Sequence, residues 1–395
     1  LFSFCLALVG SLTIGTTFFL SPVAGILTDK IGIQRTTFIG GALATLGMFS
    51  SSFLTDHVEG LYVSYGVVYG IGASLVYTPS LVILGHYFDK YMGIVNGIVT
   101  AGSSLFTILM PYVIYGLITH LGLSNCLRCL GLMMFLLMGS SVLFKPLAVA
   151  SPATLNKSKP SSWRSVINMD IWKQRRYLIW SLVIPVALFG YFVPYVHMVK
   201  FVEVSFPEDD GKLLVLMIGL TSGLGRIIFG KIADYPSVNR IVLQQISFVM
   251  IGMLTMLMTV TNSFVMLEVI ALGMGLFDGC FISLLGPIAF DLCGHQGAGQ
   301  AIGFLLGLCS LPLTVGPPVA GLIYDHTGSY TLPFLLAGIP PIVGGICLSV
   351  VHCVPQVAPP RASPPLFNGK SIIDTVSPSS PLILPESEPP KYLLL

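Results

Sequence analysis

The sequence has 395 residues, of which 54% are hydrophobic and only 9% charged, with a formal net charge of +2 and a mean hydropathy of +0.87. Soluble domains carry about 25% charged residues, so this composition excludes a water-soluble globular protein. The small net charge points to no class of partner, because in a membrane protein the placement of charge matters more than its sum.

Long apolar stretches recur along the whole chain. A stretch of about 20 predominantly apolar residues is long enough to cross a bilayer as a helix. Eleven such stretches cover roughly residues 6–27, 36–54, 61–85, 91–118, 126–145, 177–199, 213–231, 241–262, 265–290, 300–323 and 331–353. Backbone groups in lipid must be hydrogen-bonded within their own segment, so the sequence predicts an all-α membrane protein.

The basic residues gather in alternate loops. One set of loops and the C-terminal tail hold fifteen of the 19 basic residues: Lys30, Arg35, Lys90, Lys145, Lys157, Lys159, Arg164, Lys173, Arg175, Arg176, Lys231, Arg240, Arg361, Lys370 and Lys391. The other loops are mainly acidic. Cytoplasmic loops carry an excess of Lys and Arg, so the first set and the tail are predicted to face the cytoplasm.

A short motif indicates an internal duplication. Gly25-x-x-x-Asp29 recurs 205 residues later as Gly230-x-x-x-Asp234, which is typical of transporters built from repeated halves. The second copy is preceded by an apolar stretch that has no counterpart before the first. We therefore expect a 6+6 helix pseudo-repeat whose first helix is missing from an N-terminally truncated chain.

The expected organisation follows from this repeat. Residues 1–145 form the N-terminal helical half, with helices 2–6 of the fold, and residues 177–354 form the C-terminal half, with helices 7–12. Residues 146–176, rich in Lys, Arg, Ser and Pro, form a cytoplasmic linker. Residues 355–395 contain ten prolines, which predicts a disordered cytoplasmic tail.

Five short stretches of sequence indicate which family of membrane transporters the chain resembles. They are Pro79–Phe88, Gly97–Ser104, Phe189–His197, Thr221–Arg226 and Gly275–Gly279. These strings resemble the monocarboxylate transporter family of the major facilitator superfamily, and most closely its T-type branch, which carries aromatic amino acids and thyroid hormones. The resemblance covers residues 1–352 except the linker. It implies the major facilitator fold and alternating-access transport at the plasma membrane.

Two ionisable residues lie deep within apolar stretches. Asp278 is about 13 residues, or roughly 20 Å, from either end of its stretch, where a carboxylate costs about 2.5–3.5 kcal/mol unless it faces water or a cation. Arg226 could meet it across the bundle. The pair would suit the two charges of an amino acid zwitterion, and the resemblance implicates both residues in substrate binding. The alternative is an ion pair that only locks two helices together.

Four more residues are candidates for substrate contact. The resemblance places His197 near the phenol of a hormone and Tyr77 on a helix that lines the cavity, while Tyr191 and Phe277 could form aromatic walls. Each also has a structural explanation: His197 as an interfacial histidine, Tyr77 as packing against the Pro79 kink, and the other two as ordinary core aromatics.

Three charged residues at predicted cytoplasmic helix ends are candidates for gating. Asp29, Arg35 and Asp234 would pair with helix ends in one conformational state and would not touch substrate. In this way they would tune the alternation between states.

The resemblance also bears on energy coupling. Proton-driven carriers of the family have an aspartate four residues before the arginine, where this chain has Ser222. A serine cannot store a proton at neutral pH, so facilitative transport without protons or sodium is expected. A proton-coupled carrier of short monocarboxylates and a non-transporting membrane protein remain as alternatives.

Other classes of function find little support in the sequence. It shows no nucleophile paired with a base, no metal motif and no phosphate loop, so neither an enzyme nor a cofactor is predicted. The predicted partners are a small-molecule substrate and the lipid bilayer, with no nucleic acid. An accessory membrane glycoprotein and a homodimer stay open.

Overall fold

A computed structural model describes residues 2–88, 90–144 and 167–355, and every regular element among them is a helix. The described part of the linker comprises residues 167–176, whereas its remainder and the tail from residue 356 lie outside the described residues. All the helices belong to one unit, Leu1–Pro360.

The first half of the chain forms long helical rods joined by short turns. Its elements are α1 (Phe2–Phe19), α2 (Ser21–Ile31), α3 (Ile33–Phe53), α4 (Val58–Leu61), the π-helix η1 (Tyr62–Tyr69), α5 (Gly70–Tyr87), α6 (Met92–Ser140) and η2 (Ser141–Leu143). The rod formed by α4, η1 and α5 is continuous, whereas α1 and α2 bend by 41° at their junction.

The second half begins with one helical turn and continues as long helices. Its elements are α7 (Asp170–Lys173), α8 (Arg175–Tyr191), α9 (Val193–Ser205), α10 (Gly211–Ile232), α11 (Arg240–Leu257), η5 (Met258–Val260), α12 (Phe264–Thr327), α13 (Thr331–Cys347) and α14 (Val350–Cys353). Buried aromatic side chains, Trp180 and Phe248 among them, fill the space between these helices.

The two longest helices are each broken once at a glycine. Gly122 in α6 has φ 79° and Gly294 in α12 has φ 70°, values that glycine adopts without the steric cost a side chain would bring. Each long helix therefore turns back as two limbs. This matches the sequence, which predicts separate apolar stretches on either side of both glycines.

All eleven predicted stretches fall largely within helices, but the number of membrane spans is smaller when judged by length and apolarity. Eight of the described helices are long and apolar enough to cross a membrane, or nine if the bent α1–α2 pair is one span. The helix α3 is not among them, and both limbs of α6 are counted together. Eleven spans therefore remain a prediction.

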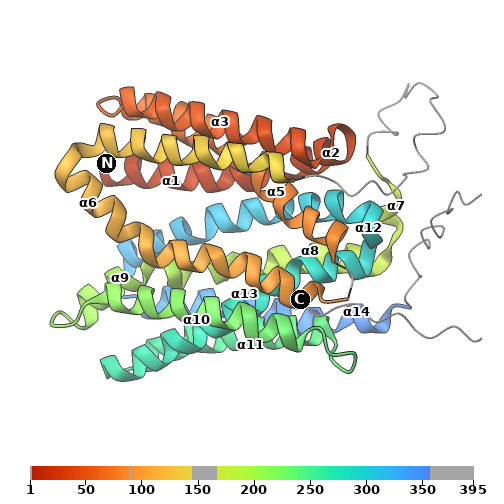
Figure 1. Cartoon of the computed structure of the whole chain (residues 1–395). Helices are drawn as coiled ribbons and strands as arrows, with labels where there is room; N and C mark the ends of the chain where they lie inside the picture. The colour runs from red at the N-terminus through yellow and green to blue at the C-terminus, as the bar shows by residue number, and fades with distance from the viewer. Residues whose placement is uncertain (1, 89, 145–166, 356–395) are drawn as a thin grey trace, which may run out of the picture. The chain divides into compact units, whose positions relative to one another are not determined.

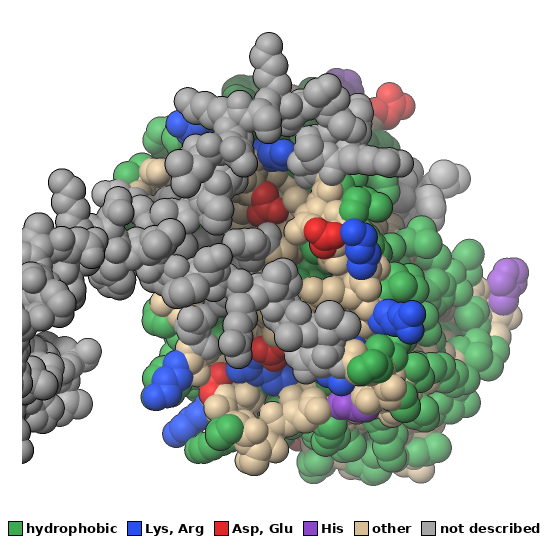
Figure 2. Space-filling view, turned by 90° about the vertical axis from the view of Figure 1, so that its right-hand side faces the viewer, with side chains coloured by type: hydrophobic (Ala, Val, Ile, Leu, Met, Phe, Trp, Pro, Cys, Tyr) green, Lys and Arg blue, Asp and Glu red, His purple; other side chains and the backbone are tan. Residues whose placement is uncertain are grey.

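The helices run side by side, and most of the basic residues that the structure describes lie at one end of the bundle, called the charged end below. The α2–α3 and α10–α11 turns and the Gly294 break lie at the right-hand end in Figure 1, while the α6 break lies at the opposite end. Figure 2 views the right-hand end, where Lys, Arg, Asp and Glu side chains gather among polar surface, while hydrophobic side chains cover the flank. This is the end that the sequence predicts to be cytoplasmic.

Candidate functional site

The two buried charges predicted from the sequence do meet. Arg226 on α10 and Asp278 on the first limb of α12 are 7% and 9% exposed, and an Nη2–Oδ2 distance of 3.7 Å separates them. Glycines allow α10 and α12 to approach this closely: a Cβ on Gly279 would lie 2.3 Å from the Ser222 carbonyl oxygen, and one on Gly225 would lie 2.4 Å from the Leu276 carbonyl oxygen.

Two hydroxyl groups hold the carboxylate of Asp278. Tyr191 on α8 donates to Oδ1, and Ser222 on α10 donates to Oδ2 at 2.5 Å. Hydrogen bonds to an ionised acceptor are among the strongest in proteins, and they offset the cost of burying the charge. Ser222, which the sequence singles out only for the carboxylate that it lacks, is thus part of the charged site.

The guanidinium of Arg226 reaches into the other half of the chain. Its Nη1 donates to the carbonyl oxygen of Thr100 and, at 2.5 Å, to the hydroxyl of Ser103, both on α6. Its Nε is buried and has no hydrogen-bond partner among the described residues. Sequence reasoning missed Thr100 and Ser103, although both lie in the string Gly97–Ser104 that carries the family resemblance.

Of the predicted aromatic residues, Tyr191 is the one that hydrogen-bonds to the charge pair in the described part of the chain. It is 3% exposed, and its ring centroid lies 5.4 Å from those of Tyr195 and Phe281, neither of which the sequence singled out. Tyr77 packs edge-on against Phe18, with centroids 6.0 Å apart, and lies close enough to Arg226 to interact with its charge. Phe277 follows the same pattern of packing between helices, since its ring lies 6.2 Å from that of Phe229.

His197 lies apart from the charge pair. Its Nε2 is 2.9 Å from the carbonyl oxygen of Pro317, and its ring centroid is 5.7 Å from that of Tyr330. Six residues separate it from Tyr191, which corresponds to about 9 Å along a helix. The histidine therefore lies nearer the predicted outer end, between α9, the second limb of α12 and the start of α13.

Asp234 joins the two halves at the charged end of the bundle. Its carboxylate accepts hydrogen bonds from the backbone N–H groups of Gly93 at 2.7 Å and Ile94 at 2.8 Å, in the first turn of α6. A carboxylate at this place satisfies two N–H groups that lack helical partners and lies at the positive end of the helix dipole. Whether this contact gates transport stays a prediction.

Asp29 occupies the corresponding place in the first half. Its carboxylate lies beside the second limb of α12, where Gln300 hydrogen-bonds to it and a Cβ on Gly299 would lie 2.9 Å from Oδ1. Each motif aspartate therefore approaches a helix of the opposite half near that helix's start. The repeat is thus visible in the contacts as well as in the sequence.

Each copy of the motif is followed, six residues after its aspartate, by an arginine, and the surroundings of these two arginines differ. Arg240, which lies 205 residues after Arg35, has its Nη2 3.2 Å from Asp234 and its Nη1 2.8 Å from Asp291. Arg35, in contrast, is exposed and has no ion-pair partner among the described residues; it lines a pocket beside α3. The sequence named Arg35 as a gating residue and overlooked Arg240 and Asp291.

Comparisons with known proteins agree with this arrangement. Residues 3–312 match the Major Facilitator Superfamily. The chain is 49% identical to Monocarboxylate transporter 10 of Danio rerio over 354 residues, which cover 88% of this chain and 69% of that protein. The chain belongs to the monocarboxylate transporter family. It is also 47% identical to Monocarboxylate transporter 10 of Mus musculus, with 88% of this chain and 70% of that protein covered.

More distant proteins share the fold. Monocarboxylate transporter 12 of Xenopus laevis is 25% identical, with 87% of this chain and 79% of that protein covered. The human organic anion transporter MFSD10 (TETRAN) superposes with a TM-score of 0.69 at 16% identity, covering 86% of this chain and 83% of that chain. The Escherichia coli fucose:proton symporter FucP superposes equally well, with a TM-score of 0.69 at 13% identity and 88% and 91% covered. This monocarboxylate transporter family member is therefore a membrane transporter and not an enzyme.

Proposed function

We propose that this transporter carries the aromatic amino acids Trp, Tyr and Phe, together with iodothyronine hormones, across the plasma membrane by facilitated, alternating-access transport that needs neither sodium nor protons. The family strings of its sequence favour these substrates. The observation that carries the proposal is the buried pair formed by Arg226 and Asp278.

The pair offers one charge of each sign deep within the bundle. An amino acid brings a carboxylate and an ammonium group into the membrane, and each needs an opposite charge to replace its water. The guanidinium of Arg226 is suited to a carboxylate, and its unpartnered Nε is one free donor. Asp278 accepts two hydroxyl donors but, as a carboxylate, has about four lone-pair positions, so an ammonium group can still bind.

The surroundings of the pair favour an aromatic substrate and a site shared by both halves. Tyr191, Tyr195 and Phe281 lie beside Asp278, and aromatic rings stack favourably on one another. Arg226 contacts α6 of the first half while Asp278 belongs to the second. A ligand between them would therefore be sensed by both halves, as alternating access requires.

The same geometry supports transport without protons. Ser222 donates its hydroxyl to Asp278, at the position where proton-driven relatives have a carboxylate. No second carboxylate lies beside Asp278 among its hydrogen-bond and ion-pair partners in the described part of the chain. The transport cycle then depends on the contacts of the gating residues, because opening the charged end would separate Asp234 from the first turn of α6.

The experiment compares ligands that lack one of the two charges. Asp278→Asn keeps the shape of the side chain and removes its charge. If Asp278 holds the ammonium group, the wild-type protein binds phenylalanine more tightly than 3-phenylpropionate, which lacks that group. In the variant the ratio of the two affinities should fall by roughly tenfold or more, because a charge-assisted hydrogen bond is lost. Arg226→Gln should in turn abolish the preference for phenylalanine over phenethylamine, which lacks the carboxylate.

Ratios of ligand affinity separate binding from folding. Removing one member of a buried pair can cost about 3–5 kcal/mol, but partial misfolding lowers the binding of both ligands equally and leaves their ratio unchanged. Binding is measured by competition on the purified protein. Unchanged ratios in both variants would mean that Arg226 and Asp278 only lock α10 to α12, and the proposed site would be wrong.

A further inference from the structure

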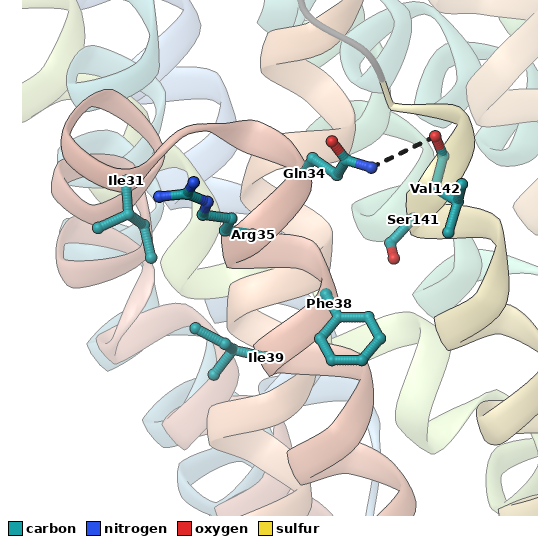
Figure 3. A pocket seen from close by; sticks show the side chains of 7 residues that line it. All are labelled: Ile31, Gln34, Arg35, Phe38, Ile39, Ser141 and Val142. Atoms are coloured by element: carbon teal, nitrogen blue, oxygen red, sulfur yellow. Dashed lines mark hydrogen bonds between the residues drawn. The ribbon is translucent and has the colours of Figure 1, made fainter.

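A second place in the molecule has the features of a binding site and shares no residue with the proposed substrate site around Arg226 and Asp278. It is a pocket of about 500 Å³ at the start of α3, and its wall includes Arg35, Ser141 and Phe38 (Figure 3). The α2–α3 turn places it at the charged end of the bundle (Figure 1). Its walls come from the first turns of α3 and from η2.

Unused hydrogen-bond donors line this pocket. The side chain of Arg35 is exposed and has no ion-pair partner among the described residues. Ser141 is 1% exposed, yet its Oγ has no hydrogen-bond partner there either. The start of α3 has no side-chain cap and no acidic residue in its first turn, so its positive end is not compensated. All three features favour the binding of an anion in this pocket.

The second half of the chain shows how an arginine at the equivalent position is paired. Arg240, the counterpart of Arg35 in the second half, is held by the carboxylates of Asp234 and Asp291. At Arg35 no carboxylate among the described residues takes that role. The charge is therefore available to an anion that the described part of the chain does not supply.

Apart from Gln34, whose Nε2 donates to the carbonyl oxygen of Val142 at 3.4 Å, the remaining wall of the pocket is apolar and continues along α3. Phe38 and Ile39 are 47% and 45% exposed, and Val142 is 56% exposed. Along α3 the exposed Leu46 follows Ile39 by seven residues, on the same face of the helix. A soluble anion would leave this surface uncovered, whereas an acyl chain would cover it.

We propose that this pocket binds an anionic glycerophospholipid from the leaflet at the charged end of the bundle. The guanidinium of Arg35, which lies on the Ile31 side of the pocket in Figure 3, pairs with the lipid phosphate, and the hydroxyl of Ser141, on the opposite side, donates a hydrogen bond to an ester oxygen of the same lipid. One acyl chain lies against Phe38 and Ile39. The lipid thereby links α3 to the end of α6 through η2, beside the motif that contains Asp29.

Native mass spectrometry of the full chain, purified in detergent and titrated with phosphatidylserine or with phosphatidylcholine of the same acyl chains, tests the proposal. The wild-type protein should retain one phosphatidylserine in preference to phosphatidylcholine. Arg35→Gln should weaken that binding by at least tenfold. The control Lys231→Gln removes an exposed positive charge at the same end that does not line the pocket, and it should leave the binding unchanged.

Ser141→Ala separates lipid binding from folding. Because the hydroxyl has no partner within the described protein, its removal should leave the melting temperature unchanged or slightly raised, while phosphatidylserine binding falls several-fold. Equal retention of the two lipids, or equal effects of Arg35→Gln and Lys231→Gln, would overturn the proposal. Displacement of the lipid by glycerophosphoserine at similar concentrations would show a soluble-anion site, and the assignment to a lipid would be wrong.

Discussion

Asp278 shows how a single buried charge is accommodated in this protein. Its position in an apolar stretch was enough to predict a nearby cation, and Arg226 lies 3.7 Å away. Its two hydroxyl donors could not be predicted, because Tyr and Ser are frequent in this sequence and the rotation of each helix decides which of them face inward. Thr100 and Ser103, the partners of Arg226 on α6, could not be predicted from the sequence for the same reason.

The first prediction concerns those donors. Tyr191→Phe removes one hydrogen bond to Asp278, and Ser222→Ala removes the other. Each change leaves a buried carboxylate oxygen without a donor, which costs about 1–3 kcal/mol. We expect a lower melting temperature and several-fold slower phenylalanine uptake at equal surface expression, with a larger loss in the double variant.

Tyr195→Phe is the matched control for this prediction. Tyr195 lies on the same face of the site, but no direct hydrogen bond joins it to Asp278 in the described part of the chain: its hydroxyl donates to the carbonyl oxygen of Met274 at 3.4 Å and hydrogen-bonds to Tyr191. Its loss should change stability and uptake much less. If Tyr195→Phe and Tyr191→Phe had equal effects, ring packing and not the bond to Asp278 would explain the role of Tyr191.

At the scale of elements, the sequence predicted the helices and their repeat but not the contacts between the halves. The motif spacing of 205 residues identified Asp29 and Asp234. Asp234 accepts from backbone N–H groups of α6 and Asp29 is hydrogen-bonded by the side chain of Gln300, and neither contact can be recognised from the motif alone. The unequal surroundings of Arg35 and Arg240 were invisible for a similar reason, because identical motif positions can face different neighbours.

A prediction at this scale concerns the crossing of α6 and α10. A Cβ on Gly97 would lie 2.2 Å from the carbonyl oxygen of Arg226, so Gly97→Ala must push the two helices apart beside the charge pair. We expect a clearly lower melting temperature and strongly reduced uptake. Gly102→Ala, on the same helix with nothing within 4 Å of the added carbon, should be neutral or slightly stabilising because alanine favours helix.

This pair of variants separates packing from helix propensity. Both replace a glycine within α6 by alanine, so they differ only in what the methyl group meets. Equal melting temperatures for Gly97→Ala and Gly102→Ala would show that the close approach of α6 and α10 does not matter for stability.

For the whole molecule, composition alone identified a helical membrane protein, and five strings identified the family to which the comparisons assign it. The number of spans was less certain from sequence, because α3 contains several Ser, Thr and Gly residues and the α1–α2 rod is bent. The alternate basic loops of the sequence lie together at one end of the bundle, which Figure 2 views. Which side of the membrane that end faces remains a prediction.

The most direct test of the central claim is uptake by the purified chain in liposomes, using labelled phenylalanine, tyrosine, tryptophan, triiodothyronine and lactate at external pH 6 and 7.5, with and without sodium. We expect saturable uptake of the aromatic substrates that changes less than about twofold with pH or sodium, and no uptake of lactate above that of empty liposomes. Lactate uptake that rises at pH 6 and is abolished by an uncoupler would contradict the account, because it would show a proton-coupled carrier of short monocarboxylates despite Ser222.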